Sequence, residues 1–218
     1  MGRFLGKNTK EYWGKKHSDQ YSDGSEWDYN DIQKSPLSYH KVASDILIQN
    51  EDAVSNKSLL EIGCAAGFFT SYIKTNLLPN FDVSGWDFSS SGIEMAKLHA
   101  ERGSYNINYE ERDFLDNPVD KNYGFICMFE TIEHVAEPDN YTVVDNILDH
   151  CEYAIISTVN TKDNCGGEHI SHYTINSFDE CGYEVIWKSK LTPINMAAVG
   201  DYGEYYYFIV LLKGKLSN

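Results

Sequence analysis

Acidic side chains lie near the ends of three short segments in the first half of the chain that are predicted to be strands. Glu61 lies in "SLLEIG", Asp87 in "FDVSGWDF" and Asp113 in "INYEERDF". A carboxylate in the second of these places can accept hydrogen bonds from both hydroxyls of a ribose. One in the third place can accept from an adenine amino group, and Phe114 beside it can cover the ring. Together these residues predict a ligand that contains a nucleoside.

A glycine-containing loop, "EIGCAAG", begins at Glu61. Gly63 and Gly67 allow the backbone to turn sharply and to approach a ligand closely, whereas Ala65 stands where a second glycine is usual. A dinucleotide would place its pyrophosphate on such a loop. The carboxylate of Glu61 would repel phosphate and attract a cationic amino group, so S-adenosylmethionine fits these residues better than a dinucleotide does.

The residue patterns around these acids predict alternating strands and helices. Strands are predicted over residues 58–63, 81–88, 107–114, 123–130 and 153–159, of which 123–130 contains a continuous apolar run. Helical spacing predicts helices over residues 36–50, 68–77, 89–103 and 140–151, with a short one near 175–182. In the helix over 89–103, Ser91 and Glu94 match a capping box, and Gly103 is expected to end the helix.

This alternation predicts the α/β class, with an open, mostly parallel sheet and right-handed crossovers. Ligands of such sheets bind beyond the carboxyl ends of the strands, which is where the three acids fall. Residues 183–191 and 205–215 are apolar runs without a helical pattern between them. They predict an antiparallel pair at an edge of the sheet.

These motifs, in this order, resemble the class I S-adenosylmethionine-dependent methyltransferases over roughly residues 35–215. The resemblance implies a Rossmann-like, seven-stranded sheet with one antiparallel strand in its edge region and helices on both faces. It implies S-adenosylmethionine as cofactor and a methyltransferase domain over residues 36–218. Residues 1–35 are polar and weakly periodic, and they are expected to form an N-terminal arm or lid. The residues that the resemblance assigns to the cofactor are Glu61, Gly63, Cys64, Ala65, Gly67, Phe68, Asp87, Phe88, Asp113, Phe114, Phe129 and Glu130.

The segment "ETIEHV" after the fourth strand holds the candidate catalytic residues Glu130, Glu133 and His134. Methyl transfer from a sulfonium needs an aligned acceptor and, for a hydroxyl acceptor, a base. His134 can take a proton near neutral pH, although the same segment can simply shape the cofactor pocket. We therefore predict methyl transfer to oxygen or nitrogen of a small molecule or sugar.

Two other functions remain open. The region also resembles the small-RNA 3′-terminal 2′-O-methyltransferases, and this resemblance implies a divalent metal on Glu130, Glu133, His134 and His169. A net charge of −15 argues against a nucleic-acid partner, so we expect no metal at this site. A non-catalytic partner subunit with the same fold is the second alternative, but it would have no need for the acids at 61, 87 and 113.

Composition sets the outer limits. The 218 residues suffice for one large domain, and no apolar run is long enough to span a membrane. Five cysteines without a C-x-x-C pair suit reduced thiols in the cytoplasm. The basic triplet at residues 15–17 is expected to be a solvated tail, and the arm's aromatic residues, such as Trp13 and Trp27, are expected to close over the cofactor or line the acceptor site. The oligomeric state stays open.

Overall fold

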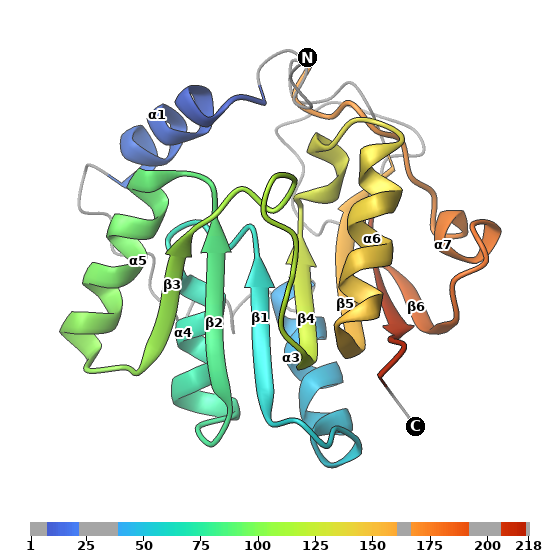
Figure 1. Cartoon of the computed structure of the whole chain (residues 1–218), viewed down its shortest axis with the longest axis horizontal. Coiled ribbons are helices and arrows are strands. Elements are labelled where there is room, and N and C mark those ends of the chain that lie inside the picture. Colours follow the sequence, from blue (N-terminus) through green and yellow to red (C-terminus); the bar gives the residue numbers. More distant parts are fainter. Residues whose placement is uncertain (1–7, 22–38, 161–166, 192–205, 217–218) are drawn as a thin grey trace.

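The computed structural model describes residues 8–21, 39–160, 167–191 and 206–216, and within them a single seven-stranded sheet organises the chain (Figure 1). Its strand order is β3-β2-β1-β4-β5-β7-β6. The strands are β1 (Ser58–Ile62), β2 (Asp82–Asp87), β3 (Ile107–Glu111), β4 (Tyr123–Phe129), β5 (Cys151–Val159), β6 (Val185–Leu191) and β7 (Tyr207–Lys213). Strands β1 to β5 are parallel, and β7 runs antiparallel to both β5 and β6. The predicted fold class is confirmed.

Helices cover both faces of this sheet, with α5 and α6 in front of it in Figure 1 and α3 and α4 behind. The helices are α1 (Lys10–Tyr21), α3 (Tyr39–Asn50), α4 (Phe68–Tyr72), α5 (Ser90–Gly103), α6 (Asp139–Asp149) and α7 (Ser177–Glu180). Single turns lie at Glu51–Ala53 and Ile132–His134, and a π turn at Ile73–Leu77 continues α4. No helix among the described residues is long and apolar enough to cross a lipid bilayer.

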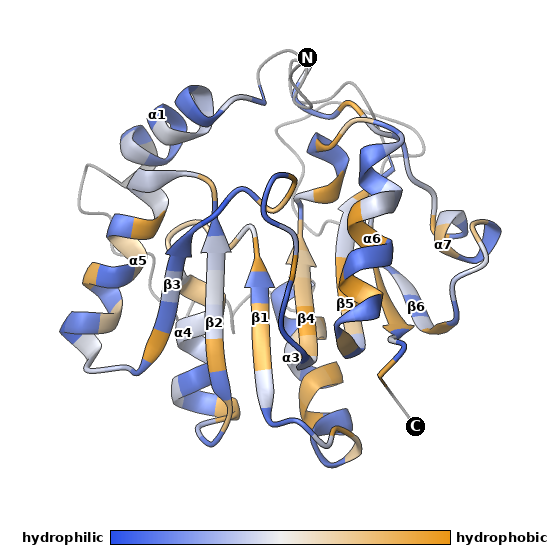
Figure 2. Ribbon diagram, viewed as in Figure 1, coloured by the Kyte–Doolittle hydropathy of each residue, from blue (hydrophilic) through white to orange (hydrophobic). Residues whose placement is uncertain are grey.

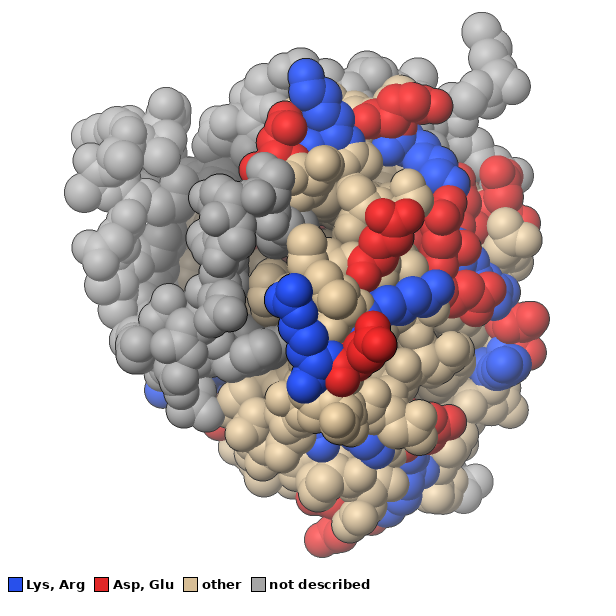
Figure 3. All heavy atoms as spheres, turned by 90° about the vertical axis from the view of Figure 1, so that its left-hand side faces the viewer, with Lys and Arg blue, Asp and Glu red and all other residues tan. Residues whose placement is uncertain are grey.

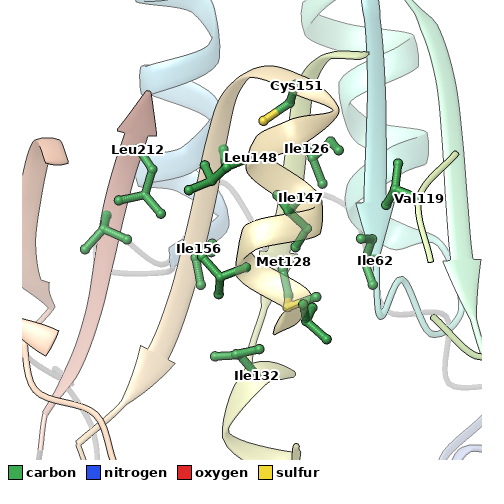
Figure 4. Close-up of a cluster of buried hydrophobic side chains, with 14 of the residues drawn as sticks. Ile62, Val119, Ile126, Met128, Ile132, Ile147, Leu148, Cys151, Ile156 and Leu212 are labelled. Carbon is green, nitrogen blue, oxygen red and sulfur yellow. The ribbon is translucent and has the colours of Figure 1, made fainter. Parts of the chain in front are cut away.

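The central strands are buried on both faces, which their apolar composition explains. Leu59 of β1 packs in the cluster with α3 and α4, whereas Leu60 and Ile62 pack in the cluster with α6. Each such side chain stabilises the fold by about 1.5–3 kcal/mol when it is fully buried. Figure 4 shows Ile147 and Leu148 of α6 among the strand residues of the second cluster. In Figure 2 the central strands are accordingly hydrophobic, whereas α1 is largely hydrophilic.

The predicted cap of α5 is wrong, whereas its predicted end is confirmed. The cap of α5 is Ser89, whose side chain accepts from the Gly92 N–H, and not Ser91. The helix ends at Gly103, and the left-handed residue that follows it is Ser104, with φ of 57°. A side chain two residues earlier caps the helix because Asp87 already accepts the Ser89 N–H and turns the chain there.

Several predicted segments are too long at their carboxyl ends, and two of them show the physical reason. The third strand ends at Glu111, so Asp113 lies in the loop that follows it. The helix predicted to end at residue 151 ends at Asp149, and Cys151 is the first, fully buried residue of β5. Cys151 continues the helical spacing of apolar residues by chance, because a buried strand begins with an apolar residue just as a buried helix face would continue with one.

Helix α1 lies beyond the carboxyl ends of the strands, at the top of Figure 1, and packs against α5. It is the part of the predicted arm (residues 1–35) that the structure describes. Trp27 and Tyr29 of that arm lie outside the described residues, as does Cys165. Cys64, Cys127, Cys151 and Cys181 carry free thiols.

Candidate active site

The glycine loop between β1 and α4 turns through left-handed backbone conformations. Gly63 and Gly67 have φ of 79° and 71°. A Cβ on Gly63 would lie 2.2 Å from Thr131 Oγ1, and one on Gly67 would lie 2.4 Å from the Tyr109 hydroxyl. Ala65 also has a positive φ, 47°, a region that costs a non-glycine residue roughly 1–2 kcal/mol. The missing glycine is therefore tolerated at a cost in backbone strain.

Asp87 at the end of β2 holds this loop in place. Its carboxylate accepts hydrogen bonds from the Ala65 N–H at 2.9 Å and from the Ser89 N–H at 2.8 Å. The side chain is 6% exposed, and burial raises its pKa against the opposing effects of His17 and of these hydrogen bonds. Asp87 thus links the glycine loop after β1 directly to the end of β2.

Glu61 of β1 is a buried carboxylate that its described surroundings satisfy only in part. It is 4% exposed, and its Oε2 atom has no hydrogen-bond partner among the described residues. Burial raises its pKa well above the ordinary value, and the nearby Asp87 raises it further. A buried acid with an unpaired oxygen, just before the loop, suits a cationic group that arrives with a ligand.

A pocket of about 210 Å³ opens at the carboxyl ends of β1, β2 and β4. It brings together most of the side chains predicted for the site. Its lining residues are Trp13, His17, Tyr39, Gly63, Ala65, Asp87, Phe88, Phe114, Phe129, Glu130, Thr131, His134 and Val135. Aromatic rings thus alternate with acids and imidazoles around one cavity.

Other predicted residues lie behind or beside this lining. Cys64 is buried, and Phe68 begins α4 with its ring 5.1 Å from that of His99. Asp113 is half-buried, and its carboxylate accepts from the Leu115 N–H at 2.9 Å, so it fixes the loop that presents Phe114. Glu61, Gly67 and Glu133 likewise lie outside the lining.

The segment after β4 gathers acids and imidazoles. Glu130, with φ of 46°, lines the pocket and accepts from Ser157 Oγ at 2.9 Å. Glu133 is fully buried, accepts from Thr158 Oγ1 at 2.8 Å, and keeps an Oε1 without a described partner. Burial raises the pKa of both acids, that of Glu133 to about 7.

Two histidines complete this cluster. His134 and His169 have ring centroids 5.1 Å apart, and Glu133, His134 and His169 each offer a ligand atom within 4.8 Å of the others. Burial lowers the pKa of His134 to about 4. The geometry therefore brings together three of the four residues in the predicted metal set, and Glu130 is not part of that group.

Helix α1 supplies a pocket residue that was not predicted from the sequence. His17 was expected in a solvated tail, but it is 7% exposed, lines the pocket and lies close enough to Asp87 for their charges to interact. Lys16 is also not free in solvent, since it pairs with Glu168 at 2.8 Å. Only Lys15 of this triplet is exposed. The spacing of Trp13 and His17, one helical turn apart, was the available signal.

Surface charge bears on the class of ligand. On the face that carries α5 and β3, basic side chains intermingle with acidic ones (Figure 3). The whole chain has 18 basic and 33 acidic residues. Both observations disfavour a nucleic-acid partner, because counterion release needs clustered Lys and Arg.

Comparisons with known proteins bear on the family and on the fold. Residues 59–152 match a family model described as "Methyltransferase domain". A ubiquinone biosynthesis O-methyltransferase of Rickettsia prowazekii (strain Madrid E) is 30% identical over 114 residues, which are 51% of this chain and 43% of that protein. The chain thus spans less than half the length of the curated relatives it matches.

Solved structures share the fold over nearly the whole chain. Magnesium protoporphyrin IX methyltransferase from Synechocystis PCC 6803, with bound SAM, has a TM-score of 0.68 at 12% identity and covers 94% of each chain. The N-methyltransferase NodS from Bradyrhizobium japonicum WM9, in complex with S-adenosyl-L-homocysteine, has a TM-score of 0.66 at 15% identity and covers 92% of this chain and 97% of its own. At these identities the likeness shows the fold alone.

Proposed function

We propose that this chain, whose residues 59–152 match a family model described as "Methyltransferase domain", is a class I S-adenosylmethionine-dependent methyltransferase that transfers a methyl group from S-adenosylmethionine to a small molecule or sugar. The accepting atom is an oxygen or a nitrogen. The match to O-methyltransferases of ubiquinone biosynthesis supports a small-molecule acceptor.

The observation that carries the proposal is the buried, unpaired oxygen of Glu61 beside a loop that Asp87 organises. Glu61 would accept a hydrogen bond from the cofactor's ammonium group, which compensates its burial. Asp87 has lone pairs left for the ribose hydroxyls, and Phe88 and Phe114, which line the pocket, would contact the adenine. The cofactor itself supplies a methyl group activated by a sulfonium.

His134 is the proposed base for a hydroxyl acceptor. Its Nδ1 lies 2.9 Å from the Glu168 carbonyl oxygen, which can only accept, so Nδ1 carries the proton and Nε2 keeps its lone pair. The pKa of about 4 keeps the ring neutral near pH 7, so the Nε2 lone pair is available, but it also makes His134 a weaker base than an ordinary histidine. Trp13, Tyr39 and Phe129 surround the same pocket and would exclude water from the transfer.

Calorimetry with S-adenosylmethionine and its demethylated product tests the cofactor assignment. We expect binding by the wild type and a loss of about 100-fold in Asp87→Ala, because two loop contacts and the ribose acceptor disappear together. Asp82→Ala, at the exposed opposite end of the same strand, is the matched control and should bind normally. No binding by the wild type would refute the proposal.

Methyl transfer is then measured with labelled cofactor against phenols, amines and sugars. His134→Ala should keep cofactor affinity and lose at least about 100-fold in turnover of a hydroxyl acceptor. Cofactor binding without transfer to any acceptor would instead favour the non-catalytic partner subunit.

A metal-assisted version of this reaction is a second candidate, favoured by the grouping of Glu133, His134 and His169. A carboxylate and two imidazoles suit a divalent transition metal, which would hold an acceptor oxygen as a Lewis acid. His169→Ala and a chelator should then abolish turnover without changing cofactor affinity, and added Mn²⁺ should restore only the wild type. Chelator-resistant turnover would rule this version out.

A further inference from the structure

One helix forms the wall of the candidate site nearest the N-terminus. Trp13 and His17 of α1 both line the pocket, and no other described residue before Tyr39 does so. The ring of Trp13 lies 4.9 Å from that of His134, at a steep angle. Helix α1 therefore closes the space between the acid at the end of β2 and the histidine after β4.

Glu168, nine residues after the end of β5, accepts two side-chain hydrogen bonds from this helix. Its carboxylate accepts hydrogen bonds from Lys16 Nζ, at 2.8 Å, and from the Tyr12 hydroxyl. Its backbone carbonyl accepts from Asn8 Nδ2, at 2.6 Å, and from His134 Nδ1. One buried residue thus joins α1 to the proposed base.

The carboxylate of Glu168 is buried and is bound by α1. The residue is 6% exposed, and the described donors to its carboxylate both come from α1. Lys16 forms an ion pair with one carboxylate oxygen, and the Tyr12 hydroxyl donates to the other. Helix α1 thus compensates the burial of this carboxylate through charge-assisted hydrogen bonds.

The opposite side of α1 is fastened to α5. Ser91 Oγ donates to the Gly14 carbonyl at 2.7 Å, and His17 packs beside Asp87. Lys16 also lies 4.3 Å from the centre of the Trp13 ring, so the same cation that binds Glu168 orients the aromatic wall.

We propose that Glu168 is a positioning residue that holds α1 across the pocket. Trp13 and His17 then form the pocket wall only while Lys16 and Tyr12 bind the carboxylate of Glu168. This inference rests on the proposed function for the identity of the ligand that the wall retains. The contact between α1 and Glu168 exists without that ligand and can be tested on its own.

Hydrogen exchange of the α1 amides in the ligand-free, full-length protein tests the fastening. Glu168→Ala should speed this exchange by about tenfold, because two charge-assisted hydrogen bonds are lost. Lys16→Met, at a half-exposed position, should also speed the exchange of the α1 amides, and it leaves the buried Glu168 side chain in place. Asp179→Asn, which removes the exposed ion pair with Lys188, is the matched control and should change nothing in α1.

Release of S-adenosylhomocysteine, followed by stopped-flow tryptophan fluorescence, tests the consequence. We expect dissociation about tenfold faster in Glu168→Ala and Lys16→Met, and a return toward wild type in the charge-swapped Lys16→Glu, Glu168→Lys protein. A merely structural role would leave the swap as impaired as Glu168→Ala. Unchanged exchange of α1 in both single variants would overturn the inference, whereas absent ligand binding by the wild type would overturn only the proposed function.

Discussion

Two buried glutamates at opposite ends of the sheet have opposite surroundings. Glu152, near the amino end of β5, is 6% exposed and accepts from the Ser55 N–H and hydroxyl and from the Asn56 N–H at 2.8–3.0 Å. Glu61, near the carboxyl end of β1, is 4% exposed and keeps an oxygen without a described partner.

The pKa values of these two glutamates are shifted in opposite directions. Burial tends to raise the pKa of Glu152, but the hydrogen bonds from Ser55 and Asn56 bring it below the ordinary value. For Glu61 burial dominates, and the pKa lies well above that value. A carboxylate that the fold satisfies stabilises the fold, whereas one that it leaves unsatisfied is available to a ligand.

Glu61→Gln should have the largest effect on ligand binding. We expect the Kd for S-adenosylhomocysteine to rise about 100-fold, since the ammonium group loses its charged acceptor. Thermal unfolding at pH 8 should shift upward or stay unchanged, because the substitution removes a poorly compensated buried charge. Calorimetry and thermal unfolding measure the two, and unchanged affinity would contradict the contrast with Glu152.

Glu152→Ala should give the reverse pattern. The free energy of unfolding should fall by about 2 kcal/mol at pH 7, because two backbone N–H groups lose a charged acceptor. Cofactor affinity should not change. Since the folded pKa is lowered, this stabilisation is present above the unfolded pKa and is lost as the pH falls through the folded pKa. Urea unfolding of the wild type and the variant between pH 7 and pH 3 measures this loss, and the difference between their free energies of unfolding should shrink as the pH falls.

Glu133→Gln, in buffer with a chelator, extends the comparison to a third buried acid. Its folded pKa of about 7 lies above that of the unfolded chain, so the wild type should lose stability as the pH rises toward 7. The variant should lack this loss and be more stable at pH 8 by on the order of 2 kcal/mol. If the free energy of unfolding of the two proteins changed with pH in the same way, the raised pKa of Glu133 would be contradicted.

Ser89→Ala should have the smallest effect. The helix cap of α5 is lost, which costs about 1 kcal/mol of stability. The Ser89 N–H still donates to Asp87, so cofactor affinity should change less than twofold or so. A large loss of affinity here would show that the loop, rather than the acid, limits binding.

The part of the site nearest to β1, β2 and β4 was predictable because neighbouring parallel strands end together. Once the strand pattern was correct, Gly63, Asp87, Phe129 and Glu130 had to meet at one edge. His17 and Glu168 were not predictable in this way. They are far apart in sequence, and they take part in the site only because α1 crosses from α5 to the loop after β5.

The amino-acid sequence by itself determined the sheet, the glycine loop and the acids that follow its strands, because period, burial and strand direction are local or topological properties. Only the tertiary structure decided which acids are satisfied. Glu61 and Glu152 are the same residue type on buried strands, and the backbone N–H groups that reach Glu152 come from a turn almost a hundred residues earlier. Tertiary packing alone also brought α1 over the pocket and brought three ligand atoms of Glu133, His134 and His169 together.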